Sequence, residues 1–310
     1  MNRPTVQPSV LLGIDCGGTH TAVVVGDGAG RVLARAEGPG SAMRPGGASA
    51  SAAVIADTAR RAAAQAGAAL PADAAVVGAA GAGREPERRA LTAALIAAEV
   101  ARVVRVLGDS EVALAAAFGV EPGILINAGT GSIAYARMPP PDSRVHRAGG
   151  YGWQMGDEGG GYWLGRRALA AAARSQDERE ESSTLLGRLL AALAVRDFDD
   201  LIRWTATASP AQVASLAPHV LNAAREGEAI AKWAVAEAGG ELARLVELLA
   251  RRFPGAEPIR VATAGGLLRP GSPLLAALHT ALATHVPRAR LIDGPVDAPT
   301  GALRLAAELL

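Results

Sequence analysis

Residues 13–21 read Gly-Ile-Asp-Cys-Gly-Gly-Thr-His-Thr, and this stretch decides the fold of the chain. A run of aliphatic residues, Val10–Ile14, leads through Asp15 into a Gly-Gly-Thr turn, and a second strand is expected over Thr21–Val25. Such a turn gathers backbone N–H groups, a hydroxyl and a carboxylate in one small volume, which suits phosphate and Mg²⁺. The same residues would also suit a tight hairpin in which Asp15 and Thr19 only satisfy the turn.

A second stretch of the same form lies near the middle of the chain. An apolar strand over Ile124–Asn127 runs into Gly129-Thr130-Gly131, and Ile133–Arg137 follows as another strand. Two equivalent turns in a duplicated frame indicate a two-sided clamp on a triphosphate. Two unrelated hairpins are the alternative. The only lysine, Lys232, follows an alanine, so a Walker phosphate loop is excluded.

The pattern around these turns indicates an α/β chain with two domains, which 310 residues are enough to form. In the first part we expect strands over 31–36, 75–79 and 103–107 and helices over 46–66 and 86–98. In the second part we expect one more strand, over 259–263, and helices over 161–174, 183–193, 210–221, 226–252 and 301–310.

A carboxylate stands at the end of a buried strand in Leu107-Gly108-Asp109-Ser110. Open α/β sheets bind ligands at this end of their strands, so Asp109 could accept the proton of a substrate hydroxyl. Asp is equally a favoured N-cap for a helix over 110–118, although Ser110 could cap in its place. Glu111, in the same first turn, is better explained by the helix dipole than by catalysis.

Residues 149–163 hold seven glycines, two acids and four large aromatic residues. Glycines allow the backbone to approach a ligand closely, and aromatic rings offer flat apolar faces to a sugar, so this stretch indicates a sugar pocket. In the plainer interpretation, Asp157 and Glu158 cap the following helix. Farther along, Ala264-Gly265-Gly266 could lie against a base or ribose, although strand-to-helix turns often use glycine for packing alone.

Composition excludes several classes of protein. The single cysteine, Cys16, allows no internal disulfide and no cysteine-based metal site within one chain, and the histidines lack metal-ligand spacing. A net charge of +1 with few aromatic residues argues against nucleic-acid binding. With no apolar run of membrane-spanning length and no secretory signal, we expect a cytoplasmic protein that does not bind membranes.

Taken in order, these motifs resemble the N-acetylglucosamine kinase branch of the actin-like ATPase superfamily, close to the BadF/BadG/BcrA/BcrD ATPase family. The resemblance covers nearly the whole chain. It implies two actin-like (ribonuclease H-like) domains with a central cleft, the second enlarged by helices. We expect the first over residues 1–118, closed by a C-terminal helix over 298–310, and the second over 119–297.

The resemblance also implies roles for individual residues. Asp109 would be the general base, Asp15 would position Mg²⁺, and the sugar 6-hydroxyl would attack the γ-phosphoryl group of ATP. The expected ATP ligands are Gly17, Gly18, Thr19, Thr21, Gly129, Thr130, Gly131, Gly265 and Gly266. The expected sugar ligands, besides Asp109, are Ser41, Gly150, Tyr151, Gly152 and Asp157.

One departure bears on the substrate. Amino-sugar kinases carry a Ser-Asn or Thr-Asn pair after the third strand, whereas here the stretch over 38–44 is Gly-Pro-Gly-Ser-Ala-Met-Arg. Without that Asn, N-acetylglucosamine, free glucosamine and another hexose are all candidate substrates.

Three other functions compete with a kinase. An activator ATPase would need two cysteines per chain for its bridging [4Fe–4S] cluster, and only Cys16 is present. A repressor/kinase would need a zinc cluster and a helix-turn-helix module. Asp109 argues against a sugar sensor without activity. A homodimer is expected, because the long amphipathic helix over 226–252 could serve a dimer as well as a core.

Overall fold

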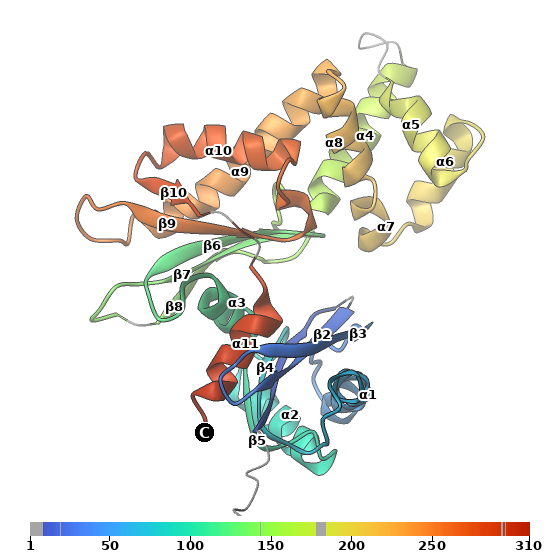
Figure 1. Cartoon of the computed structure of the whole chain (residues 1–310). Coiled ribbons are helices and arrows are strands. Elements are labelled where there is room, and N and C mark those ends of the chain that lie inside the picture. Colours follow the sequence, from blue (N-terminus) through green and yellow to red (C-terminus); the bar gives the residue numbers. More distant parts are fainter. Residues whose placement is uncertain (1–8, 19, 143, 178–183, 293, 295) are drawn as a thin grey trace, which may run out of the picture. The chain divides into compact units, whose positions relative to one another are not determined.

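Two five-stranded sheets with the same strand order form the frame of the chain in this computed structural model (Figure 1). The structure describes residues 9–18, 20–142, 144–177, 184–292, 294 and 296–310. It divides into unit 1, Met1–Glu121 with Val296–Leu310, and unit 2, Pro122–Pro295.

The sheet of unit 1 has its first strand in the centre. On one side of β1 the pairing is antiparallel, and on the other side β4 and β5 are parallel to it. The order is β3 (Val32–Pro39), β2 (His20–Asp27), β1 (Val10–Cys16), β4 (Ala72–Ala79) and β5 (Ala101–Gly108). The antiparallel start expected from the Gly-rich turns and the later parallel pairing are both present.

Unit 2 repeats this arrangement strand for strand. Here β6 is central, pairs antiparallel with β7 and parallel with β9, and the outer strands β8 and β10 continue each half. The order is β8 (Val145–Gly149), β7 (Ser132–Arg137), β6 (Gly123–Ala128), β9 (Ile259–Ala264) and β10 (Ala289–Leu291). The duplicated frame expected from the two Gly-Thr turns is therefore present in the fold.

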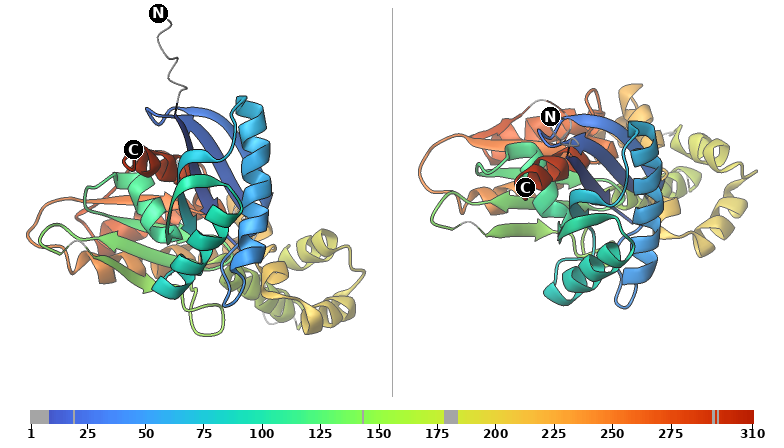
Figure 2. Two further views of the ribbon diagram at one scale, coloured as in Figure 1. Left: turned by 90° about the horizontal axis from the view of Figure 1, so that it is seen from below. Right: turned by 60° about the horizontal axis from the view of Figure 1, so that its bottom comes forward.

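Helices cover both faces of the sheet in unit 1, with α1 and α11 on opposite faces (Figure 2). Side chains alternate along β1, so Leu12 and Ile14 pack in the core with α1, whereas Leu11 packs with α11. These helices are α1 (Ala48–Ala66), α2 (Glu85–Ala97), α3 (Asp109–Phe118) and α11 (Ala298–Ala307).

Unit 2 owes most of its size to helices. The long helix α9 lies on β6, β7 and β8 and packs against α8 and α10. Its inward side is fully buried, so its apolar residues form the core of the unit. The helices are α4 (Gly161–Gln176), α5 (Leu185–Leu193), α6 (Phe198–Thr207), α7 (Pro210–Ala214), α8 (Ala217–Arg225), α9 (Ala229–Ala250), α10 (Pro273–His285) and the short 3₁₀ turn η1 (Gly266–Leu268).

The expected elements differ from the structure in a few places. The helix expected over 210–221 is two helices, because Pro218 has no N–H to donate to the preceding turn and the chain restarts with Pro218 in the first turn of α8. The elements without an expected counterpart are β8, α6, η1, α10 and β10. The expected helix start at Ser183 lies outside the described residues.

Among the described residues, no helix is both long enough and apolar enough to cross a bilayer.

Candidate active site

Asp15 lies near the end of the central strand of unit 1. It has the same parity as Leu11 along β1, so its side chain belongs to the face that α3 and α11 cover. Burial raises the pKa of Asp15 to about 6, and the charges of Asp109 and Asp297 raise it further while that of His20 lowers it. Asp15 is therefore an acid in a partly dry, negatively charged environment.

Asp109 is the first residue of α3, directly after β5. The N-terminal capping role belongs to Glu111, whose Oε2 accepts the N–H of Gly108 at 2.8 Å. Asp109 uses one oxygen, Oδ1, to accept the N–H of Ser110 at 2.8 Å. The alternative in which Asp109 is merely an N-cap is thus wrong, because Gly108 holds that position and Glu111 supplies the bond.

Burial raises the pKa of the Asp109 carboxyl above its ordinary value, and the nearby charge of Glu111 adds to this. The N–H of Ser110 acts in the opposite direction. A carboxylate that is desolvated but still ionisable is a stronger proton acceptor than one in water.

Asp297, which the sequence analysis did not select, joins this group. It directly precedes α11 and binds Arg35 through both carboxylate oxygens at 2.5 Å, and Thr300 donates to it at 2.5 Å. The backbone of α11 reaches β1 because Gly13 has no side chain: a Cβ there would lie 2.1 Å from the carbonyl oxygen of Pro299. An Asp before Ala-Pro is a helix-start signal, but nothing in the sequence places it beside Asp15.

The Gly-Gly-Thr turn after β1 is exposed at its tip. The N–H of Gly17 bonds to the carbonyl of His20 at 2.9 Å, and its own carbonyl accepts the N–H groups of Ser41 and Ala42 at 3.1 and 3.0 Å. A Cβ on Gly18 would meet no atom within 4 Å, so the backbone there is open to a ligand. Thr19 lies outside the described residues.

The hydroxyls of Thr21 and Ser41, expected to contact ATP and sugar, bond to each other in this structure. Both residues are buried, and Thr21 donates to the carbonyl of Pro39 at 2.7 Å. Because the single proton of Thr21 is used there, Ser41 must donate in the 2.5 Å bond between the two hydroxyls. These side chains tie β2 to the segment after β3 and do not present a donor to ATP or sugar.

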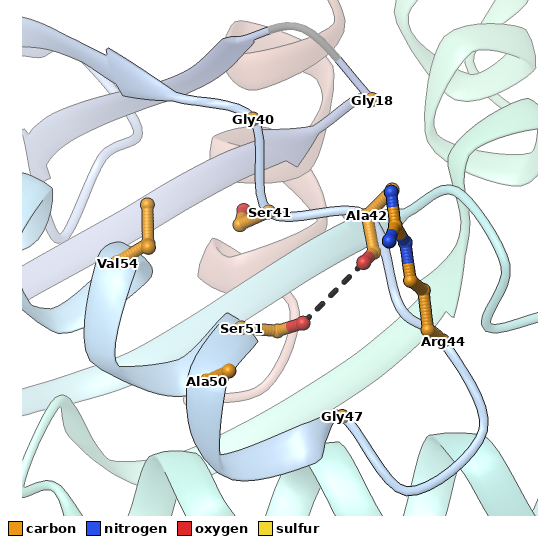
Figure 3. Close-up of a pocket in the computed structure, with 9 residues that line it drawn as sticks. All are labelled: Gly18, Gly40, Ser41, Ala42, Arg44, Gly47, Ala50, Ser51 and Val54. Carbon is orange, nitrogen blue, oxygen red and sulfur yellow. Dashed lines mark hydrogen bonds between the residues drawn. The ribbon is translucent and has the colours of Figure 1, made fainter.

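The segment after β3 borders a cavity of about 260 Å³ within unit 1 (Figure 3). In the figure Ser51 reaches the carbonyl of Ala42, a bond of 3.4 Å, and Arg44 extends beside Ala42. Within the described chain, the guanidinium of Arg44 has no hydrogen bond or ion pair. The lining residues are Gly18, Gly40, Ser41, Ala42, Arg44, Gly47, Ala50, Ser51 and Val54.

The second Gly-Thr turn follows β6 in unit 2. It closes through the N–H of Gly129 and the carbonyl of Gly131 at 2.9 Å, and Thr130 at its tip is exposed. The start of α4 supports it from behind, since Gly161 and Tyr162 donate to the carbonyls of Gly129 and Thr130 at 2.8 and 2.9 Å. The turn is therefore rigid while its Thr hydroxyl faces outward.

Gly265 lies directly beside this turn. Strands β6 and β9 are neighbours, with Asn127 opposite Ala264. Gly265 has φ of +90°, and a Cβ there would lie 2.2 Å from the carbonyl oxygen of Ala128. The structure thus brings together, within unit 2, the residues expected to hold phosphate and those expected to lie by the nucleoside, including the exposed Gly266.

The expected sugar loop after β8 is anchored on the same turn. Asp157, with φ of +65°, accepts the N–H groups of Gly152 and Ser132, and burial raises the pKa of its carboxyl. Gly150 also has positive φ, 71°, and fits over the side chain of Ile133. A non-glycine residue held at positive φ is strained, a feature that gathers at ligand sites.

Aromatic side chains of this loop are exposed. Tyr151 is 56% exposed, and the guanidinium of Arg147 lies 5.0 Å from the centre of its ring. Trp153 is 44% exposed, and its ring centre lies 5.0 Å from that of Tyr162. Such half-exposed rings are the flat faces expected of a sugar platform.

A bound Mg²⁺ fits the acids of unit 1. No three His, Cys, Asp or Glu side chains among the described residues are grouped closely enough to hold a metal ion directly. Mg²⁺ usually keeps several waters and binds one or two carboxylates together with substrate phosphates. Burial and the neighbouring acids Asp109 and Asp297 raise the pKa of Asp15, and a cation bound through water would favour its charged form.

Two five-stranded sheets of the same order, each with a Gly-Thr turn after its central strand, define the actin-like fold of nucleotide-dependent kinases. A ROK family glucokinase from Streptomyces griseus, solved with glucose and AMPPNP, shares this fold with a TM-score of 0.60 and 18% identity. The match covers 97% of this chain and 100% of its own.

Residues 12–306 match the BadF/BadG/BcrA/BcrD ATPase family, and the chain belongs to that family. An N-acetylmuramic acid/N-acetylglucosamine kinase from Clostridium acetobutylicum is 30% identical over 236 residues, 74% of this chain and 76% of its own. A structure from Chromobacterium violaceum, assigned as an N-acetylglucosamine kinase, has a TM-score of 0.78 and 31% identity, covering 96% of this chain and 99% of its own. The chain is accordingly an ATP-using sugar kinase, a phosphotransferase.

Proposed function

We propose that this kinase transfers the γ-phosphoryl group of ATP to the 6-hydroxyl of an amino sugar, N-acetylglucosamine or glucosamine, with Asp109 as the general base. The observation that supports the proposal most is that Glu111 and Asp109 have different hydrogen-bonding roles in the first turn of α3. Glu111 supplies the N-terminal cap, so the half-buried Asp109 keeps a carboxylate oxygen for a substrate.

The reaction needs one proton to leave the sugar. As the oxygen of the 6-hydroxyl forms its bond to the γ-phosphorus and the bond between that phosphorus and ADP breaks, Asp109 takes the hydroxyl proton. Phosphoryl transfer passes through a loose transition state, so catalysis depends more on in-line positioning and charge neutralisation than on a strong base. The raised pKa of Asp109 helps it to hold the proton once transferred.

Each Gly-Thr turn is a candidate contact for the phosphates of ATP. In unit 2 the hydroxyl of Thr130 and the open backbone at Gly265 and Gly266 are the expected contacts for phosphate and nucleoside. In unit 1 the open backbone at Gly18 has the same role, and Asp15 would hold Mg²⁺ through water. Bound Mg²⁺ would neutralise phosphate charge.

The sugar would rest on the loop over 150–157. Gly150 and Gly152 permit close backbone approach, Tyr151 offers its exposed ring, and Asp157 offers a carboxylate already fixed by two backbone N–H groups. The hydroxyl of Ser41 bonds to Thr21, so Ser41 would act as part of the wall of the cavity in unit 1 and not as a hydrogen-bond donor.

The test is ADP release by the folded protein with ATP, Mg²⁺ and a panel of sugars. We expect turnover with N-acetylglucosamine or glucosamine, and a phosphate ester on the 6-oxygen in the product by NMR. Absence of sugar-stimulated ADP release, or a product phosphorylated at another oxygen, contradicts the proposal.

Arg44 favours a second candidate substrate, an amino sugar that carries a carboxylate. The relative from Clostridium acetobutylicum is a kinase for N-acetylmuramic acid as well as N-acetylglucosamine. In the described chain the Arg44 guanidinium lines the cavity without a partner, at the segment where the Asn of amino-sugar kinases is missing. A guanidinium is well suited to bind a carboxylate.

This candidate predicts a selective defect in Arg44→Gln. With N-acetylmuramic acid, kcat/KM should fall by about 10–100-fold, the range for one charge-assisted bond, while the value for N-acetylglucosamine changes little. An equal fall of kcat/KM for both sugars would show that Arg44 does not bind the carboxylate of N-acetylmuramic acid.

A further inference from the structure

Arg88 on α2 is connected by hydrogen bonds to the residue that precedes the proposed base. Its Nη2 donates to Glu111 Oε2 at 2.7 Å, and the same oxygen accepts the N–H of Gly108 at 2.8 Å. Gly108 is followed by Asp109. A continuous path of two short bonds thus runs from α2 to the first turn of α3.

Few other groups hold this turn. The N-cap residue of α3 is a glycine, so it has no side chain to offer to the first N–H groups. Among the described residues, two side chains bond to the backbone at 108–110: Glu111 accepts the N–H of Gly108, and Asp109 itself accepts that of Ser110. If Glu111 turns away, the N–H of Gly108 loses its acceptor and the first turn loses its fixed geometry.

Arg88 is itself well anchored. Its Nε donates to the carbonyl of Ala82 at 2.9 Å, in the segment after β4. That segment is in turn bonded to its neighbours, because Ala80 donates to the carbonyl of Cys16 at 2.9 Å and accepts the N–H of Met43 at 2.7 Å. One guanidinium therefore links the ends of β4 and β5.

We propose that Arg88, acting through Glu111, is a positioning residue for Asp109: it fixes the first turn of α3 and so the direction of the Asp109 carboxylate. The inference rests on the proposed role of Asp109. Misplacing a reacting group by about 1 Å can cost about 100-fold in rate, so the effect falls on turnover. Arg88 itself does not need to touch sugar or ATP.

The chain supplies a matched control in the next residue. Arg89 lies on the same helix and also forms an ion pair, with Glu85 at 2.8 Å, but it has no link to Gly108. Arg88→Ala and Arg89→Ala therefore each remove one arginine and one ion pair from α2. Only the first change releases Glu111.

The experiment compares kcat and both KM values of Arg88→Ala, Glu111→Ala, the double variant and Arg89→Ala, with folding checked by circular dichroism. We expect kcat to fall by about 10–100-fold in Arg88→Ala and in Glu111→Ala, with KM values within about twofold. Because both act on one path, the double variant should be no slower than the slower single variant. Arg88→Lys should recover part of the loss, and Arg89→Ala should match the wild type.

Three results overturn the inference: wild-type kcat in Arg88→Ala, an equal loss in Arg89→Ala, or losses that multiply in the double variant. If Arg88→Ala does not fold, Glu111→Ala decides, since it removes the acceptor of the Gly108 N–H and the partner of Arg88. Wild-type kcat there also overturns it.

Asp109→Asn, run in parallel, separates this inference from the proposed function. Full turnover in that variant would show that Asp109 is not the base and would contradict the proposed function. Lost turnover in that variant, together with wild-type rates in the Arg88 and Glu111 variants, would contradict only the positioning role of Arg88.

Discussion

The two units share a sheet and a Gly-Thr turn but differ in charge beside that turn. Asp15 stands two residues before Gly17 in unit 1, and Asn127 stands two residues before Gly129 in unit 2. Asp15 has Asp109 and Asp297 nearby, whereas Asn127 lies beside the bare backbone of Gly265. The same frame thus gives one turn with three acids near the end of its strand, suited to a cation and a proton. The other turn has an amide at that place and a single carboxylate, Asp157, packed against Gly131.

The largest effect is expected from the acid unique to unit 1. Asp109→Asn keeps the shape of the site but removes the proton acceptor, so kcat should fall by about 10²–10⁴-fold. Sugar affinity, measured by calorimetry, should stay near that of the wild type. Unchanged turnover would mean that another group is the base.

Exchanging the acid and the amide tests the comparison directly. Asp15→Asn should lower kcat/KM for MgATP by about 10–100-fold, the usual cost of losing an outer-shell metal partner. Asn127→Asp should raise KM for ATP by about tenfold, because it places a negative charge beside the phosphate turn. Titration of both variants with Mg²⁺ checks the assignment: only Asp15→Asn should need more metal.

A smaller effect is expected at the turn of unit 2. Gly265→Ala places a methyl group 2.2 Å from the Ala128 carbonyl at φ of +90°, which should cost about 1–3 kcal/mol of stability. Gly266→Ala is the control, since a Cβ there meets nothing within 4 Å. Urea unfolding measures both. Equal stability of the two variants would show that the Gly265 conformation is not required.

The smallest effect is a pH dependence that is expected from Asp15 in unit 1. The pKa of Asp15 is about 6 in the folded chain and about 3.8 when unfolded, so the folded state binds a proton more tightly. Stability from this group is therefore lost as pH rises from about 3.8 to 6.

Asp15→Asn should remove that loss. In metal-free protein its stabilisation over the wild type should be about 1–2 kcal/mol greater at pH 7.5 than at pH 4.5, measured by urea unfolding. Asn127→Asp serves as a comparison from unit 2. A stabilisation by Asp15→Asn that does not change with pH would contradict the raised pKa.

The strands that could be predicted from the sequence are those with a local pattern of aliphatic residues and turns. Aliphatic runs that end in Gly-rich turns predict strands β1, β2, β6 and β7. The duplicated strand order of the two sheets follows from these strands. The short strand β8, Val145–Gly149, carries His146 and Arg147 and ends in glycines, so it lacks that signal. It forms because β7 offers an edge to pair with.

What the sequence by itself determined is the kind of site: Gly-Thr turns after apolar strands, an acid at a strand end, and a loop rich in glycine and aromatic residues. Tertiary structure decided which groups serve it. It engaged the hydroxyls of Thr21 and Ser41 with each other, gave the capping role to Glu111, and brought Asp297 beside Asp15. The physical reason is that a turn is made by neighbours in the chain, whereas the partners of a buried polar group come from any strand or helix that packs against it.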